Sequence, residues 1–309
     1  MSRRGWVLFA ALSVIWGIPY LLIRIAVRDL SPPTLVFFRT GAAGLVFLPV
    51  LLRPQALVAL RKRWLAIVVY TVVEVSVPWL LLSRGEQRLT SSLAGLLIAT
   101  VPLIAIVFSW ATGHEPLGWS RLAGLALGFA GVAVIVGVDV HGPNLEAVLE
   151  VLGTALCYAL GPFIVARRLS DVPSSTVVGA SLVLTAIGYA PIGLTHLPRR
   201  ITPEELTSMI ILVVACTGIA FLIYFALIAE VGPSRATVIT YVNPAVAVVL
   251  GIAILHEHFS VGLALGVPLV LAGSFLGTGG IHPPPVSAPE TDPAPADRDV
   301  EPTAPAAGP

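Results

Sequence analysis

Long apolar stretches separated by short polar breaks run through most of this 309-residue chain. About 20 consecutive apolar residues form a helix long enough to cross the hydrocarbon of a bilayer. The pattern predicts ten such helices. They are expected at 6–27, 35–52, 64–82, 91–111, 118–138, 146–166, 174–196, 208–230, 236–255 and 261–279. The first stretch is longer than the apolar core of a signal peptide, so we interpret it as an uncleaved first span.

An internal duplication organises this pattern. When the sequence is shifted by 142 positions, Ala94–Gly137 falls on Ala236–Gly279 without a gap. The two segments share a proline, a His-Glu pair and three glycines: Pro102 and Pro244, His114-Glu115 and His256-Glu257, and Gly124, Gly131 and Gly137 with Gly266, Gly273 and Gly279. Five helices per copy is an odd number, so the two copies must enter the membrane in opposite directions. The sequence therefore predicts an all-α membrane protein of two inverted five-helix repeats, residues 1–140 and 141–280.

The composition agrees with a membrane protein. The chain is 56% hydrophobic and 11% charged, whereas a soluble domain has about 25% charged residues. Its net charge of +1 gives no reason to expect a nucleic-acid partner. The two cysteines, Cys157 and Cys216, lie in apolar runs and are interpreted as small buried side chains. Residues 281–309 are rich in Pro, Ala and acids, and they are expected to form a disordered tail.

Loop charges predict the orientation, because Lys and Arg accumulate on the cytoplasmic side of a membrane. If the N-terminus is inside, the inner segments carry more basic residues than the outer ones. The inner set is Arg3, Arg4, Arg53, Arg61, Lys62, Arg63, Arg121, Arg167, Arg168 and Arg235. The outer set is Arg28, Arg84, Arg88, Arg199 and Arg200. We therefore predict a multi-pass protein of the cytoplasmic (inner) membrane with both termini cytoplasmic.

Charged residues inside predicted spans are candidates for function, because an ionisable group in the hydrocarbon is costly. Glu74 lies near the middle of the third predicted helix, among Val72, Val73 and Val75. A carboxyl at this depth could take up and release a proton during transport. Alternatively, it could be a neutral structural acid, or be paired permanently with Arg24 or Arg39. Arg39 in turn could pair with Glu74 or bind a carboxylate of the substrate.

Helix breaks and aromatic residues provide further candidates. Pro102 and Pro244 lie inside predicted helices, where a proline removes a main-chain hydrogen bond and kinks the helix. Two matched breaks indicate a central site, although a packing kink is the alternative. Tyr241 and Asn243 add polar groups beside Pro244. The repeat also pairs Trp16 with Tyr158 near the middle of the membrane, where both could line a pocket or simply pack.

The two His-Glu pairs do not have the spacing of a helical zinc site, which needs His at i and i+4. We therefore predict no metal site and no cofactor. Glu115 and Glu257 are interpreted as acids near the N-termini of the fifth and tenth helices, where the helix dipole favours negative charge.

These motifs together resemble the EamA-type transporters of the drug/metabolite transporter superfamily. The resemblance covers residues 6–279. It rests on Trp16-Gly17 with Pro19, on Phe37-Phe38-Arg39 with Gly41, Ala42 and Ala43, and on Pro102 and Pro244, each followed by a break that ends in Glu115 or Glu257. His before each Glu is a departure, since the family often has Gly there. The resemblance implies a basket of ten helices around a central cavity, in a monomer or homodimer that exports or imports amino acids, metabolites or drugs.

The sequence thus favours a secondary active transporter over an enzyme. It would move a small organic solute by alternating access, as an exporter and with possible proton coupling. The alternatives are an intramembrane lipid-modifying enzyme and a membrane ligand-binding protein without transport. No Ser-His-Asp arrangement for an enzyme is visible within the predicted spans.

Overall fold

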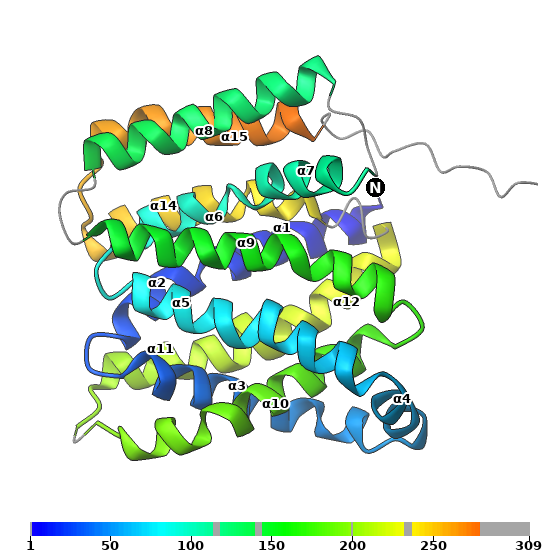
Figure 1. The fold of residues 1–309 in the computed structure, drawn as a ribbon. Coiled ribbons are helices and arrows are strands. Elements are labelled where there is room, and N and C mark those ends of the chain that lie inside the picture. The colour runs from blue at the N-terminus through cyan, green and yellow to red at the C-terminus, as the bar shows by residue number, and fades with distance from the viewer. Residues whose placement is uncertain (1, 114–117, 140–143, 199, 232–236, 279–309) are drawn as a thin grey trace, which may run out of the picture.

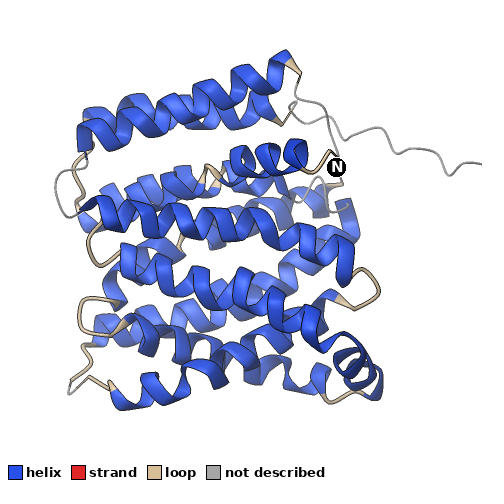
Figure 2. Ribbon diagram, viewed as in Figure 1, coloured by secondary structure: helices blue, strands red, loops and turns tan. Residues whose placement is uncertain are grey.

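The computed structural model describes residues 2–113, 118–139, 144–198, 200–231 and 237–278. In these ranges the chain forms helices joined by short loops and contains no strand (Figure 2). The expected all-α fold class is therefore confirmed. The tail from Ile281 and the predicted acid Glu115 lie outside the described residues.

The helices follow the predicted apolar stretches. Up to Asp139 they are α1 (Arg3–Gly17), α2 (Pro19–Ala26), α3 (Pro32–Leu51), α4 (Pro54–Tyr70), the π-helix η1 (Thr71–Ser76), α5 (Val77–Gly85), α6 (Ser91–Ile98), α7 (Val101–Ala111) and α8 (Trp119–Asp139). From Asn144 they are α9 (Asn144–Arg168), α10 (Ser174–Thr195), α11 (Pro203–Val213), the π-helix η2 (Val214–Ile219), α12 (Ala220–Val231), the 3-10 helix η3 (Thr237–Tyr241), α14 (Asn243–Leu255) and α15 (Val261–Gly277).

In the part of the chain that the structure describes, eight helical stretches are long and apolar enough to cross a membrane. Several combine shorter elements, such as α1 with α2 and α4 with η1 and α5. Two shorter apolar helices, Ile239–Leu255 and Val261–Gly277, occupy the last two predicted positions. The chain is a multi-pass membrane protein.

The spans lie side by side in one bundle (Figure 1). We call the end of the bundle at the right of Figure 1 the near end; α1 begins there at Arg3, and α3 and α12 end there at Leu51 and Val231. The opposite end, at the left, is the far end, where α2 ends at Ala26 and α14 ends at Leu255. Successive spans run in opposite directions, so α1 starts at the near end whereas α9 starts at the far end. Two tightly packed pairs, α8 with α15 and α3 with α10, lie at opposite sides of the bundle.

The third span begins earlier than the sequence predicts. The chain is helical from Pro54, and Arg63 has non-helical angles (φ −115°, ψ 19°) that kink α4. The Arg63 side chain donates two hydrogen bonds to Asp171 Oδ2, at 3.1 and 2.9 Å. This contact lowers the pKa of the Asp171 carboxyl and joins the near ends of α4 and the α9–α10 loop. The kink thus lets a basic segment bend along the bundle end rather than enter the apolar region.

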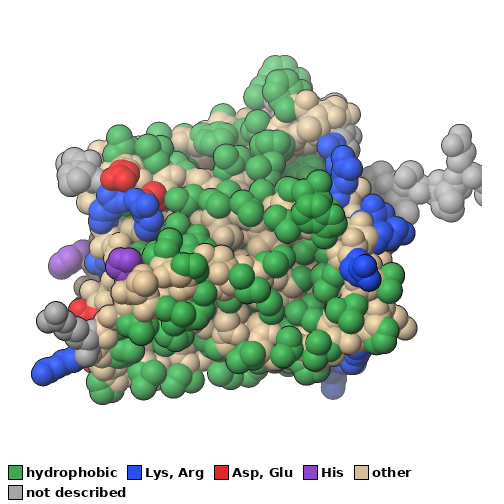
Figure 3. Space-filling view, turned by 60° about the horizontal axis from the view of Figure 1, so that its bottom comes forward, with side chains coloured by type: hydrophobic (Ala, Val, Ile, Leu, Met, Phe, Trp, Pro, Cys, Tyr) green, Lys and Arg blue, Asp and Glu red, His purple; other side chains and the backbone are tan. Residues whose placement is uncertain are grey.

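The outer surface has the distribution expected of a membrane protein. Figure 3 shows Lys and Arg side chains at both ends of the molecule and apolar side chains over most of the face between them. Large apolar residues such as Leu45, Leu65 and Ile187 are more than half exposed in this band. In water such a surface would be an unusually large apolar patch, whereas in a bilayer it contacts lipid.

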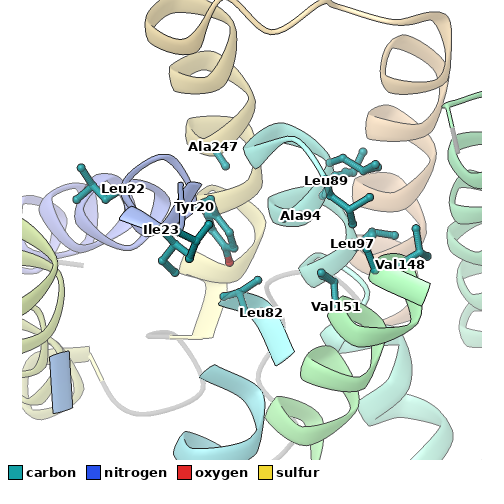
Figure 4. Close-up of a cluster of buried hydrophobic side chains, with 14 of the residues drawn as sticks. Tyr20, Leu22, Ile23, Leu82, Leu89, Ala94, Leu97, Val148, Val151 and Ala247 are labelled. Atoms are coloured by element: carbon teal, nitrogen blue, oxygen red, sulfur yellow. The ribbon is translucent and has the colours of Figure 1, made fainter. Parts of the chain in front are cut away.

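A cluster of buried apolar side chains joins several helices in the interior (Figure 4). It brings together Tyr20 and Ile23 of α2, Leu97 of α6, Val151 of α9 and Ala247 of α14. These residues are at most 7% exposed. The cluster fixes the first span against the broken spans that contain α6 and α14.

Glycines let α8 and α15 approach backbone to backbone. A Cβ on Gly124 would overlap the main chain of Gly277, and a Cβ on Gly273 would overlap the main chain of Gly128. Small residues at helix contacts serve this purpose in membranes, where no hydrophobic effect drives helices together.

We therefore expect Gly273→Ala to force α8 and α15 apart and to destabilise the protein by about 1–3 kcal/mol, the usual effect of overpacking. The measurement is the midpoint of thermal unfolding in detergent. Gly137→Ala is the matched control on α8, because a Cβ there has no neighbour within 4 Å. Equal midpoints for the two variants would show that the close helix approach is not needed.

Candidate functional site

The third span widens into a π-helix at the position of Glu74. The physical reason is Pro78, which lacks an N–H and whose ring clashes with the carbonyl four residues earlier, that of Glu74. Two carbonyls near this proline find partners on other helices. Tyr189 donates to Ser76 O at 3.0 Å, and Thr154 donates to Pro78 O at 3.1 Å.

Glu74 points from η1 towards α9. Its carboxyl lies directly against Gly161, where any Cβ would overlap it. Its Oε2 atom is buried and has no hydrogen-bond partner among the described residues. The side chains of Tyr70, Tyr158 and Tyr224 lie within electrostatic range of this carboxyl. The third span thus places an acid within electrostatic range of three tyrosines, at a contact that only glycine permits.

Arg39 lies on α3 and is 8% exposed. Its guanidinium carbon is 3.8 Å from the centre of the Trp79 ring, a cation–π contact. Its Nε donates to Thr217 Oγ1 at 3.1 Å. The described residues contain no ion pair between Arg39 and Glu74 or between Arg24 and Glu74 within 4 Å. The permanent Glu74 pairs that the sequence left open are therefore not formed here.

The second π-helix, η2, supplies the partner of Arg39. Thr217 accepts the hydrogen bond from Arg39 and donates its own proton to Leu212 O, five residues earlier, at 2.8 Å. The hydroxyl therefore joins the Arg39 guanidinium to the main chain of α11. As a result, η1 contributes Glu74 and η2 contributes Thr217 to the interior of one bundle.

Trp16 and Tyr158, the predicted aromatic pair, lie in two different clusters of apolar side chains. Trp16 packs on Tyr224, with ring centres 5.0 Å apart, and on Phe221 at 5.9 Å. Tyr158 packs in the cluster that contains Trp79. Tyr224 and Tyr158, one from each cluster, both lie within electrostatic range of Glu74.

The two proline breaks have matching geometry. Pro102 and Pro244 stand at the second residue of α7 and α14, directly after the interruption of the span. At the first break, Ala99 O accepts a hydrogen bond from Ser274 of α15 at 3.0 Å. At the second break, the side-chain amide nitrogen of Asn243 donates hydrogen bonds to Ile239 O and to Ser13 O, each at 3.0 Å.

Tyr241 does not join the Glu74 group. Its hydroxyl hydrogen bonds with Thr278 Oγ1 at 2.6 Å and donates to Ser274 O at 3.3 Å. Tyr241 and Asn243 thus hold the broken span in place. Of the other candidates, Arg39 and Tyr158 both lie at the cluster around Trp79, and Trp16 packs on Tyr224.

At the far end, Glu257 binds a different helix from the one expected. Its carboxylate accepts hydrogen bonds from the main-chain N–H and the hydroxyl of both Ser91 and Ser92, at 2.5 to 3.0 Å. It therefore caps the N-terminus of α6 rather than that of α15, whose cap is Ser260. His256 makes this possible, since its left-handed conformation (φ 54°) ends α14 and turns the chain back.

A pocket of about 500 Å³ opens beside this cap. Its lining includes Arg24, Gln87, Thr90 and Glu257. Two acids of α9, Glu146 and Glu150, form ion pairs with Arg84 and Arg88 at the same end. Polar contacts between the first and second halves of the chain therefore lie at the far end, beside the pocket.

These features define an all-helical, multi-pass membrane protein with broken spans around buried charged groups. The model of the EamA-like transporter family matches residues 3–137 and again residues 145–278. The chain belongs to the EamA-like transporter family.

Similar proteins agree with this assignment. The chain is 32% identical to the Escherichia coli (strain K12) protein named uncharacterized inner membrane transporter YedA, over 86% of this chain and 90% of that protein. It is 26% identical to the uncharacterized transporter YvbV of Bacillus subtilis, over 87% and 90%. A protein of Salmonella typhimurium named probable amino-acid metabolite efflux pump is 23% identical over 91% and 97%. One solved crystal structure shares the fold, with a TM-score of 0.63, 20% identity and coverage of 90% and 97%.

Several residues of this region gave no signal in the sequence. Thr217 and Gly161 are common residue types in apolar spans, and only the packing shows that one holds Arg39 and the other contacts Glu74. Glu86 was overlooked because it lies in the polar stretch Arg84–Arg88, although the structure buries it completely. A single acid between two arginine residues is ordinary in a loop.

We expect Arg39→Lys to destabilise the protein by about 1–2 kcal/mol, because a lysine keeps the charge but loses the planar stacking on Trp79 and the bond to Thr217. Thermal unfolding in detergent measures this effect. Arg53→Lys is the control, since Arg53 is exposed at the near end. A midpoint for Arg39→Lys equal to that of the control would contradict the assigned contact.

Proposed function

We propose that this protein is a secondary active transporter that exports a small organic solute across the cytoplasmic membrane by alternating access, coupled to protons. The solute class that we test first is amino acids, because one relative is named probable amino-acid metabolite efflux pump. The single observation that carries the proposal is the position of Glu74, an acid in the interior of a span whose Oε2 atom is buried without a hydrogen-bond partner among the described residues.

The chemistry of Glu74 supports proton coupling. An ionised carboxylate without hydrogen-bond donors is costly in a low-dielectric interior. The carboxyl therefore needs a proton, a water molecule or a cationic solute as its partner. Because the Glu74 carboxyl can hold either a proton or a cationic group of the solute, it can exchange one for the other during each transport cycle. The nearby tyrosine hydroxyls provide further hydrogen-bonding groups.

Arg39 supports an organic solute with a negative group. Of its five N–H donors, Nε is bound to Thr217. The remaining donors suit a carboxylate, which a guanidinium can bind through two parallel hydrogen bonds. In this proposal Arg39 binds the carboxylate of the solute while Glu74 exchanges its proton.

Alternating access is supported by the relation between the two halves. The family model matches twice, once in 1–140 and once in 141–280. The elements repeat at nearly the same offset: η1 at Thr71–Ser76 with η2 at Val214–Ile219, and the start of α7 at Val101 with that of α14 at Asn243. Inverted repeats of this kind interchange their conformations when a transporter opens to the other side.

Charge supports placing the near end in the cytoplasm. Described near-end residues include Arg3, Arg53, Arg61, Lys62 and Arg167, with few acids among them. At the far end, acids such as Glu146 and Glu150 accompany the arginine residues. By the positive-inside rule the N-terminus and α15's end at Gly277 then face the cytoplasm.

The test is transport in proteoliposomes loaded with a radiolabelled amino-acid mixture, with and without an imposed pH gradient. We expect efflux that accelerates with the gradient in the wild type. Glu74→Gln cannot exchange a proton, so its residual flux should no longer respond to the gradient, while Glu74→Asp should retain part of the response. Glu146→Gln, which removes an exposed acid, is the control for charge. A gradient response in Glu74→Gln equal to that of the wild type would remove Glu74 from the proton path.

Gly161→Ala tests the same contact from the opposite helix. Its methyl group would occupy the space of the Glu74 carboxyl and displace it. We expect a loss of most gradient-driven flux, measured in the same vesicles. Gly188→Ala is the control, because a Cβ there has no neighbour within 4 Å. Normal flux in Gly161→Ala would show that the position of the carboxyl is unimportant.

A further inference from the structure

A groove at the far end, between α2, α11 and the end of α14, takes no part in the proposed transport mechanism. Its volume is about 680 Å³, which lies within the range of known ligand sites. The helix α2 packs against both α11 and α14 (Figure 1). The groove opens at the surface of the bundle, since Ile254 in its wall is 51% exposed. It therefore lies where helices of the two halves of the chain meet, within reach of the surrounding lipid.

Two opposing walls of the groove are each formed by one face of a helix. Residues spaced by three or four positions lie on the same side of a helix, and both walls have this spacing. These residues are Leu21, Ile25 and Arg28 along α2 and just beyond it, and Glu204, Thr207 and Ile211 along α11. The groove therefore runs along the two helices rather than across them.

The polarity of the groove changes with depth in the membrane. Arg28 lies just beyond the end of the first span, and Glu204 lies in the first turn of its own span. Leu21 and Ile211 lie about two helical turns, roughly 10 Å, deeper along the same two walls. A water-soluble molecule would match only the charged outer part. A phospholipid matches both parts, because its headgroup is polar and its acyl chains are apolar.

The charged groups at the mouth of the groove are held only loosely. Arg28 Nη1 lies 3.8 Å from Glu204 Oε2, which is longer than a hydrogen bond, and the two side chains are 54% and 78% exposed. Such exposed ion pairs contribute little to stability, so both groups can exchange each other for a ligand. His256, which follows α14, adds a ring nitrogen to the same lining. The mouth thus presents a cation and an anion side by side.

We propose that this groove binds one phospholipid whose headgroup carries a phosphate and a primary ammonium group. The phosphate accepts hydrogen bonds from Arg28 and His256, and the ammonium group donates to the carboxylate of Glu204. An acyl chain lies over Leu21 and Ile211. The proposal goes beyond the transport function and does not depend on it.

The two charged residues have different roles in selecting the headgroup. Arg28 binds the phosphate, which all phospholipids share, so it contributes affinity without selectivity. Glu204 needs a cation with N–H donors. A choline headgroup has the positive charge but no N–H, and a glycerol headgroup has no positive charge, so both bind Glu204 less well than a primary ammonium group does.

The experiment measures lipid binding to the delipidated full-length protein by native mass spectrometry from detergent. The probes are phosphatidylethanolamine, phosphatidylcholine and phosphatidylglycerol with identical palmitoyl and oleoyl chains. We expect phosphatidylethanolamine to bind about tenfold more tightly than the other two, because hydrogen bonds between charged groups are the stronger ones. Equal affinities for the three lipids, or tighter binding of phosphatidylglycerol, would overturn the proposal.

Variants of the charged pair separate affinity from selectivity. Glu204→Ala should remove the preference for phosphatidylethanolamine over phosphatidylcholine. Arg28→Ala should weaken the binding of all three lipids, whereas Arg28→Lys should retain part of it. Arg84→Ala is the matched control, because Arg84 is a similarly exposed, ion-paired arginine at the same end but does not line the groove. An unchanged preference in Glu204→Ala would contradict the assigned headgroup contact.

A bulky side chain tests the location of the lipid. Thr207→Trp places an indole in the groove and should cause loss of the selectively bound phosphatidylethanolamine. Leu206→Trp is the control, since Leu206 is the adjacent residue, is 47% exposed and does not line the groove. Equal binding in the two variants would place the lipid elsewhere and reject this site.

Two further features keep the test decisive. The comparison of the three lipids uses the wild-type protein, so it stands even if a variant fails to fold. Displacement of the bound lipid by an added amino acid would assign the groove to the solute and overturn the proposal. Because the measurement needs neither flux nor a gradient, a failure of the transport assay leaves its result intact.

Discussion

The main constraint on this fold is that main-chain polar groups inside a bilayer need partners within the protein. Continuous helices meet it by themselves, but this chain interrupts several spans. At several described interruptions a side chain from another helix donates to a main-chain carbonyl, as Tyr189 and Thr154 do near η1 and Ser274 does at the break before α7. The irregular segments can therefore exist only where other helices surround them. This is why the functional residues and the packing cannot be separated in this protein.

The same need for partners explains how the buried charged side chains are arranged. Arg39 is deep in the bundle, yet the structure pairs it with an aromatic face and a hydroxyl rather than with an acid. Buried ion pairs often gain little over their desolvation cost, and a fixed pair would also neutralise both groups for any solute. Oε2 of Glu74 and both carboxyl oxygens of Glu86 have no hydrogen-bond partner among the described residues. Exposed arginine–glutamate pairs, in contrast, are confined to the bundle ends, where water reaches them.

The sequence predicted the parts that depend on local pattern. Apolar runs located the spans, and the shift of 142 positions paired the two proline breaks, whose positions in α7 and α14 agree. Glu74 was found because an acid among valines is conspicuous. The repeat division itself and the roles of the site residues stay predictions. The parts that depend on three-dimensional contact were missed. Thr217 looks like any threonine in an apolar run, and Glu86 looks like an ordinary loop residue, although the fold buries it completely. The sequence predicted that Glu257 caps the helix that follows it in the chain, whereas its carboxylate binds the N-terminus of α6 from the other half of the chain.

The paired π-helices have a mechanical consequence. A π turn holds one more residue than the surrounding helix requires. If that surplus shifts along the span, the residues it passes rotate by about 100°, the angle between neighbours in an α-helix, while the rest of the span stays hydrogen bonded. Glu74 lies within the π-helix η1, and Thr217 lies within the π-helix η2. A shift of the π turn along its span would thus rotate each side chain out of the interior while the span as a whole keeps its tilt.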